Sequence, residues 1–301
     1  MNKLIERIEK FNPWTTMFGY MRSLLILATL LMLVFNDTST LFSYSQYSLS
    51  CDNLFVPTAF CLVDNTTFSF ELIRYIMIII LLISLLGFYP KYTGIIHWYI
   101  CYSIQSSALT IDGGEQIATV LSFLLIPITL LDRRKNHFIN QNNDIKFFNK
   151  TIVFLFFNLI RIQVCLIYLN AAIARLKNKE WADGTAIYYF FKDPIFGIPD
   201  WEQQLFSPFL ETNILIIITW SVTMLELFLA ANIFTTKKLK MYALILGFLL
   251  HIGIMFTIGI WTFGLVMLSA LLFYLAPLDF NVIKIKNIMS FRNKRNGIVN
   301  I

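Results

Sequence analysis

The chain carries an uncharged run of 38 residues, from position 241 to position 278. As one helix this run would be about 57 Å long, nearly twice the roughly 30 Å of a hydrocarbon core. We therefore expect it to turn back near residues 257–259 and to form two membrane spans. The composition agrees, because only 14% of the residues are charged, against about 25% in soluble domains. A soluble globular domain is excluded.

Charged residues mark the limits of the other spans, because a charge at the bilayer centre costs roughly 2.5–3.5 kcal/mol. The pattern predicts an all-α, polytopic membrane bundle of about eight transmembrane helices, with no sizeable soluble domain. The expected spans are residues 14–35, 69–89, 92–110, 116–131, 151–175, 212–235, 241–257 and 260–277.

The distribution of Lys and Arg predicts the orientation of these spans. With both termini in the cytoplasm, the inner segments hold 17 of the 24 Lys and Arg residues and the outer segments hold four. Cytoplasmic loops collect Lys and Arg, so we expect a multi-pass protein of the cell membrane with both ends inside. Residues 1–10 then form an amphipathic segment on the inner membrane surface, and residues 281–301 a basic cytoplasmic tail. The net charge of +6 follows from this topology and does not indicate nucleic-acid binding.

Cys51 and Cys61 both fall in the first expected outer loop. Cysteines on an oxidising face favour a disulfide, here a local one that fastens a loop. A redox-exchange site would need a closer Cys-x-x-Cys pair, so this role is disfavoured.

The outer segment 176–211 is rich in aromatic residues, Trp181 among them, and contains three prolines. We expect one short helix at residues 183–191, beginning at Asp183 or Gly184 and lying along the outer membrane surface. Aromatic residues that only anchor the bundle at the interface would give the same pattern.

Four ionisable residues lie well inside the expected spans, away from the span ends: Arg22, Arg161, Glu226 and His251. Ionisable groups in membranes usually face the bundle interior and mark functional sites. Arg161, Glu226 and His251 fall near the middle of their spans, which predicts an Arg161–Glu226 ion pair with His251 nearby. A structural clamp that fixes the helix register explains the same residues equally well.

One polar stripe runs along the expected span 151–175 at helical spacing. It would meet the segment 177–184 and the turn from Asp112 to Glu115, and it either lines an outward cavity or is buried in helix contacts. Its members are Asn158, Arg161, Cys165, Tyr168, Ala172 and Arg175.

The sequence contains no metal-binding or hydrolytic motif. Its three histidines, at positions 97, 137 and 251, are too few and too scattered for a protein metal site. Neither metal binding nor hydrolysis by a known device is expected.

Several motifs carry a resemblance to a known family. Residues 168–186 (YLNAAIARLKNKEWADGTA) are similar to the signature of the HTTM family, the membrane domain shared with vitamin K-dependent gamma-carboxylases. Arg22, residues 205–209 and the run after His251 resemble other parts of that domain. Within the family, the turn 112–115 (DGGE) and residues 131–134 (LDRR) most resemble the sporulation-delaying protein B (SdpB) group.

The resemblance implies an HTTM-like domain over residues 11–280. Members of the group accompany a secreted toxin precursor and a small partner protein, and they are implied in maturing the precursor into an antimicrobial peptide. A lipid quinone as cofactor is implied by the family alone. The carboxylases have a Lys-Leu pair whose lysine is the base, whereas this chain has Arg175 before Leu176. Arginine stays protonated and cannot act as that base.

Our first hypothesis is extracytoplasmic processing or modification of a secreted toxin peptide. Arg175 would hold an anion or oxyanion, Glu180 and Asp183 would handle protons or contact the peptide, and His251 would be a further catalytic candidate. Residues expected to line the cavity are Arg161, Tyr168, Glu226, Asp112, Glu115, Trp181 and Arg22. A non-enzymatic transporter or export and assembly factor is the second hypothesis, and an immunity protein is the third.

Overall fold

The long uncharged run folds into two helices, α12 (Lys237–Thr257) and α13 (Trp261–Leu275), as expected. The turn between them contains Gly259, whose φ of +79° lies in the left-handed region that only glycine adopts readily. The computed structural model describes residues 3–42, 51, 56–64, 66–109, 112–140, 145–193, 197–198, 200–210 and 212–278. The predicted basic tail at 281–301 lies outside these residues.

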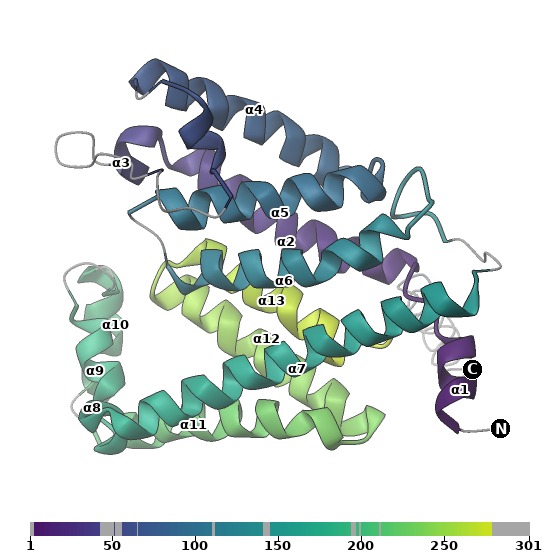
Figure 1. The fold of residues 1–301 in the computed structure, drawn as a ribbon. Helices are drawn as coiled ribbons and strands as arrows, with labels where there is room; N and C mark the ends of the chain where they lie inside the picture. Colours follow the sequence, from purple (N-terminus) through teal and green to yellow (C-terminus); the bar gives the residue numbers. More distant parts are fainter. Residues whose placement is uncertain are drawn as a thin grey trace, which may run out of the picture.

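The described residues form a bundle of α-helices with two short 3-10 helices (Figure 1). The remaining elements are α1 (Lys3–Lys10), α2 (Thr16–Phe35), α3 (Thr38–Phe42), η1 (Ala59–Leu62), α4 (Thr67–Leu85), α5 (Pro90–Ser107), α6 (Gly113–Leu130), α7 (Phe147–Lys177), α8 (Lys179–Ala182), α9 (Ala186–Phe191), α10 (Asp200–Leu210), α11 (Ile214–Ala231) and η2 (Asn232–Phe234).

The helices are apolar enough for a membrane bundle. Six of the described helices have the length and composition of a membrane span, namely α2, α4, α6, α7, α12 and α11 extended by η2. Helix α13 is shorter, with 15 residues, and α5 has 18 residues but more polar ones, including Thr93 and His97. Each of the eight expected spans overlaps one of these eight helices, while the number that cross the membrane stays a prediction.

Helix α2 lies between two hydrophobic clusters. One cluster packs α2 against α6, α7, α11, α12 and α13. The other packs the second half of α2 against α3, η1, α4 and α5. Because α2 contributes to both, it joins the two halves of the bundle.

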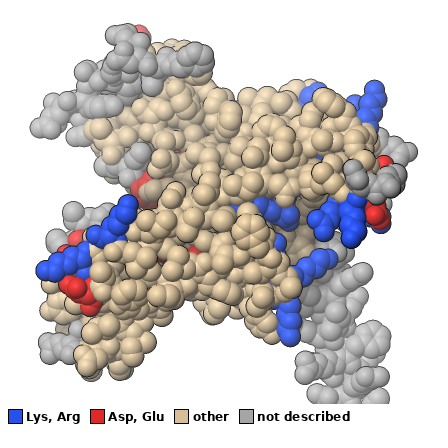
Figure 2. Space-filling model, turned by 60° about the horizontal axis from the view of Figure 1, so that its bottom comes forward, with Lys and Arg blue, Asp and Glu red and all other residues tan. Residues whose placement is uncertain are grey.

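The bundle has two ends of different composition (Figures 1 and 2). The end with α1 and the segment after α6 will be called the basic end, because Lys and Arg gather there, on the right in Figure 2. The opposite end, with α3 and α8–α10, will be called the disulfide end. A broad belt between them is almost free of charged atoms on the face shown in Figure 2.

The aromatic segment differs from its prediction. The expected helix at residues 183–191 begins only at Ala186. Gly184, whose φ is +79°, interrupts the helical conformation between α8 and α9. A Cβ at Gly184 would lie 2.7 Å from the Ile216 side chain, so glycine also permits this turn to approach α11. The second helix, α10, was not expected. It contains Pro208 in its last turn, where a proline removes only one late backbone hydrogen bond.

Candidate functional site

An ion pair joins α7 and α11, which run antiparallel and side by side (Figure 1). Arg175 Nη2 lies 2.9 Å from Glu226 Oε1, and the Glu226 side chain is only 5% exposed. Side chains of a helix lean toward its N-terminus. Arg175 therefore leans into the bundle and Glu226 leans toward the disulfide end, so the two meet although their positions along the helices differ.

A hydrogen-bonded pair of rings lies in the same region. The Tyr168 hydroxyl is 2.8 Å from His251 Nε2, and both residues are almost completely buried. Tyr168 precedes Arg175 by seven residues, two turns on one face of α7, and it is close enough to Glu226 to interact electrostatically. Helix α12 contributes His251, so three helices converge on this site.

Four buried polar atoms of this region have no hydrogen-bond partner in the part of the chain that the structure describes. They are Arg175 Nη1, Glu226 Oε2, His251 Nδ1 and Thr219 Oγ1. We name Tyr168, Arg175, Glu226 and His251, together with Thr219 two turns before Glu226 on the same face of α11, the Arg175 cluster. Because most buried polar groups in proteins are paired, four unpaired atoms in one cluster point to a ligand-binding role.

The Arg175 cluster is reachable from the disulfide end. The Arg175 side chain is 21% exposed, and its guanidinium lies 4.1 Å from the ring centroid of Trp181 in α8. An aromatic face attracts a cation and holds it in place. Trp181 therefore holds the partly exposed Arg175 guanidinium in place, while the role of Trp181 at a site stays a prediction.

The predicted Arg161–Glu226 ion pair is wrong. Arg161 lies over the ring of Phe157, 4.9 Å from its centroid, and its Nε has no partner among the described residues. It is within electrostatic range of Lys240, near the start of α12. Because Arg161 also leans toward the N-terminus of α7, its side chain points to the basic end and away from Glu226.

Arg22 belongs to a different cluster, at the basic end. Its guanidinium donates to His137 Nδ1 (3.2 Å) and to Thr93 Oγ1 (2.8 Å). Nearby, Arg134 and Asp132 form a buried ion pair at 2.7 Å. We name these five residues the Arg22 cluster. The expectation that Arg22 lines the same cavity as Arg175 is not met.

His137 is held neutral in the Arg22 cluster. An arginine can only donate, so His137 Nδ1 accepts, and its Nε2–H donates to Ser23 Oγ at 3.0 Å. Burial, followed by the charges of Arg22 and Arg134, lowers the pKa of His137 to about 3. The cluster thus fastens the segment after α6 to α2 with a neutral imidazole.

The acidic candidates lie outside the Arg175 cluster. Glu180 and Asp183 are exposed at the start and end of α8. Asp112 and Glu115 form a capping box at the start of α6, in which the Asp112 N–H donates to Glu115 Oε2 at 2.9 Å. The ring of Phe263 lies between this turn and His251. Glu226 is therefore the carboxylate at the site.

A groove at the disulfide end also contains Asp112. Its volume is about 610 Å³, and Phe35, Trp261 and Thr262 line it together with the turn before α13. The groove is thus built by α2, α6 and α13, whereas the Arg175 cluster is built by α7, α11 and α12.

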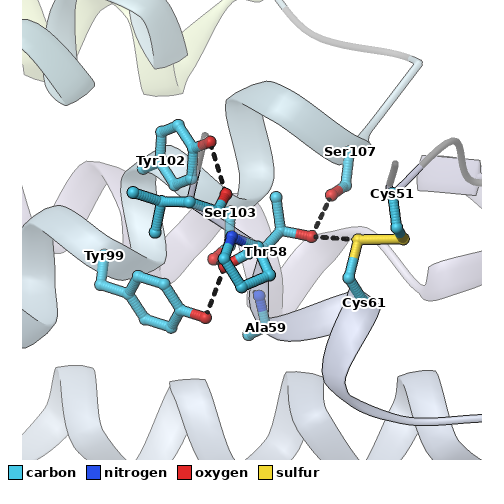
Figure 3. Close-up of a disulfide and its surroundings, with 10 residues drawn as sticks. Cys51, Thr58, Ala59, Cys61, Tyr99, Tyr102, Ser103 and Ser107 are labelled. Carbon is cyan, nitrogen blue, oxygen red and sulfur yellow. Dashed lines mark hydrogen bonds between the residues drawn. A yellow bond between two sulfur atoms is a disulfide. The ribbon is translucent and has the colours of Figure 1, made fainter. Parts of the chain in front are cut away.

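The predicted disulfide is present between Cys51 and Cys61. Figure 3 shows Thr58 between Ser107 of α5 and Cys61, with Ser107 donating to Thr58 Oγ1 at 2.8 Å. Tyr99 and Tyr102 donate to backbone carbonyls of the same loop, and Ser103 accepts from the Ala59 N–H. These hydrogen bonds fasten the loop to α5, and the disulfide therefore has a structural role.

Two residues of the polar stripe of α7, Tyr168 and Ala172, are buried, and the other four are half-buried. Cys165 donates to the carbonyl of Ala230 in α11, and Ala172 is fully buried. Only its last part, from Tyr168 to Arg175, reaches the cluster. Sequence reasoning missed Thr219 and Thr223, which are buried on the same face of α11 as Glu226. Thr219 and Thr223 precede Glu226 by seven and three residues, and this helical spacing is the signal that could have revealed them.

The fold and the site define a helical membrane protein with a buried ion pair open to one end of its bundle. The chain is 56% identical to sporulation-delaying protein SdpB of Bacillus subtilis (strain 168), over 94% of this chain and 88% of the relative. It is 36% identical to uncharacterized protein YitO of the same strain, over 93% of this chain and 91% of that protein. The chain therefore belongs to the SdpB family.

No family model matches the chain, so the wider HTTM resemblance stays a prediction. No solved structure matches it either.

Proposed function

We propose that this protein acts in a sporulation-delaying toxin system, where it is required for the extracytoplasmic maturation of a secreted toxin peptide. The observation that carries the proposal is the 56% identity to SdpB over nearly the whole chain. A secreted precursor and a small partner protein of the same system are the expected partners.

The Arg175 cluster is the proposed working site. It combines a guanidinium, a carboxylate, an imidazole and two hydroxyl groups, and four of its buried atoms have no partner among the described residues. The positive-inside rule predicts that the basic end faces the cytoplasm, which would direct the cluster toward the outer face. A secreted peptide would then reach Arg175 beside Trp181.

The mass of the secreted peptide tests this function. Cells carrying the precursor are compared with and without this protein, and the peptide is analysed by mass spectrometry in medium and cells. We expect the mature mass only when the protein is present. Arg175→Ala should abolish it while the protein still inserts, and Lys177→Ala, two positions along α7 and exposed, should leave it unchanged.

Two results contradict maturation. An unchanged peptide mass, with the peptide trapped inside cells that lack the protein, indicates export. Protection from added toxin by this protein alone, with no effect on peptide mass, indicates immunity.

A further inference from the structure

The ion pair of the Arg175 cluster has an unusual property: only one nitrogen and one oxygen are engaged. Arg175 Nη2 contacts Glu226 Oε1, while Arg175 Nη1 and Glu226 Oε2 are buried without partners among the described residues. The two free atoms belong to the same ion pair, so the pair offers one unused donor and one unused acceptor.

The free atoms restrict the chemistry of a ligand. Nη1 needs a hydrogen-bond acceptor and Oε2 needs a hydrogen-bond donor. Arginine and glutamate together are neutral, so a ligand with a full charge would be buried without a counter-ion. A neutral group with both a donor and an acceptor satisfies all three conditions, and a peptide group, with its N–H and C=O, has this composition.

Resting on the proposed function, we infer that the Arg175–Glu226 pair binds a backbone amide of the peptide substrate. The C=O accepts from Arg175 Nη1 and the N–H donates to Glu226 Oε2. Lipid esters, which surround a membrane protein, offer only acceptors and leave Oε2 unsatisfied. The pair therefore distinguishes a peptide from the lipid around it.

The position of Thr219 fits an extended peptide. Thr219 is fully buried, its Oγ1 has no partner among the described residues, and it precedes Glu226 by seven residues on α11. Seven residues of helix rise about 10 Å, which equals about three residues of extended chain. A peptide lying along α11 would thus meet a second polar atom three residues from the amide at Glu226.

We expect a peptide to approach this face of α11 from the disulfide end, where the molecule is hollowed between two arms, on the left in Figure 2. The partly exposed Arg175 lies at the entrance, with Trp181 over it. The N-terminal end of α11 lies at the disulfide end, and Thr219 is nearer to it than Glu226. An entering peptide would meet Thr219 Oγ1 first and Glu226 Oε2 second.

Three small probes test the inference on the full-length protein in lipid nanodiscs at neutral pH. They are N-methylisovaleramide and methyl isovalerate, which differ only in NH against O, and isovalerate, which keeps the same acyl chain and ends in a carboxylate. Binding is measured by NMR titration. We expect the amide to bind about tenfold or more tightly than the ester, because the ester places an oxygen against Glu226 Oε2. The amide should also bind more tightly than the carboxylate.

Glu226→Gln reverses the charge preference. The variant keeps the shape of the side chain but leaves Arg175 without its counter-ion, so isovalerate should become the tightest ligand. The matched control Lys177→Gln removes an exposed cation from the same helix and should leave the order unchanged.

Equal binding of amide and ester, no saturable amide binding, or the same order in Glu226→Gln as in the unaltered protein would overturn the inference. The unaltered protein provides the amide-to-ester ratio even if the variant does not fold. If the probes fail while the peptide mass still depends on this protein, maturation stands and the amide site falls. If the amide binds and the peptide mass is unchanged, maturation falls.

Discussion

Arg22 and Arg175 are arginines of the same apolar bundle, yet their surroundings differ. In the Arg22 cluster the polar side chains are paired: Arg134 binds both oxygens of Asp132 and donates to the carbonyls of His137 and Ile139. In the Arg175 cluster the ion pair uses one nitrogen and one oxygen, and four buried atoms lack partners among the described residues.

This difference teaches how to separate structural from functional charges in a membrane bundle. A buried network that is fully hydrogen-bonded fixes the positions of its elements, and it has no atom left for a ligand. Unpaired donors and acceptors in a buried network lower the stability of the protein, and a ligand that pairs with them offsets this cost. The type of residue and its depth are therefore less informative than the count of its partners.

Arg134→Ala should have the largest effect on stability. It leaves Asp132 buried and unpaired, which we expect to lower the free energy of unfolding by about 3–5 kcal/mol. SDS titration of the purified protein measures this. Glu226→Ala is the comparison: Arg175 keeps partial exposure and can be hydrated, so we expect less than half of that loss together with lost maturation. Equal losses in both variants would remove the distinction between the clusters.

Replacing both Cys51 and Cys61 by serine tests the disulfide loop. This loop lies at the same end of the bundle as the Arg175 cluster, but its polar groups are hydrogen-bonded. The disulfide closes a sequence separation of ten residues, and its loss should lower the free energy of unfolding by about 2–3 kcal/mol. Peptide maturation should persist in folded protein, because the loop is fastened to α5 and supplies no atom to the cluster. Folded but inactive protein would give the loop a role in function.

Much of the bundle was predictable because charge is so costly in a membrane. The scarcity of charge located the long helices, and the 38-residue run had to turn near Gly259, where the structure turns. The disulfide was predictable because Cys51 and Cys61 share one loop. These predictions depend on properties of single segments.

The pairing of charges was less predictable because it depends on packing between helices. Their positions within the spans predict similar depth for Arg161 and Glu226, but Cys165 lies beside Ala230, which places Arg161 one turn to the basic side of this contact and Glu226 one turn to the disulfide side. The direction in which each side chain leans increases this offset. That direction sends Arg161 toward Lys240 and brings Arg175 to Glu226. The partner of Arg22 is His137, which lies outside the expected spans. Helical spacing within a span could not have indicated this contact.

The neutral His137 makes the stability of the Arg22 cluster depend on pH. Its pKa is about 3 in the folded protein, owing to burial and to Arg22 and Arg134, and about 6.5 when unfolded. Protonation therefore favours the unfolded state. Stability is retained above pH 6.5 and falls as the pH decreases below it, by about 2 kcal/mol at pH 5.

The His137→Gln variant isolates this contribution. Glutamine can accept from Arg22 and donate to Ser23 but does not titrate. The difference in free energy of unfolding between variant and unaltered protein, measured from pH 8 to pH 5, should change in the variant's favour by about the same 2 kcal/mol. A constant difference would show that His137 does not titrate as the geometry requires.

Two threonines give the most direct comparison, because Thr58 and Thr219 are both completely buried. Thr58 Oγ1 accepts from Ser107 and donates to Cys61 Sγ, whereas Thr219 Oγ1 has no partner among the described residues. Valine has the same shape without the hydroxyl. Thr58→Val should lower the free energy of unfolding by about 1 kcal/mol, and Thr219→Val should leave it unchanged or raise it by about 1 kcal/mol, because it removes an unpaired buried hydroxyl.

The activities of the two variants should differ in the opposite sense. Thr219→Val removes an atom that we place against the peptide, so maturation should decrease while stability is kept. Thr58→Val should mature the peptide normally, because its hydroxyl serves the disulfide loop. A Thr219→Val protein as active as the unaltered one would mean that the free hydroxyl does not contact the peptide, and the Arg175–Glu226 pair would have to recognise it alone.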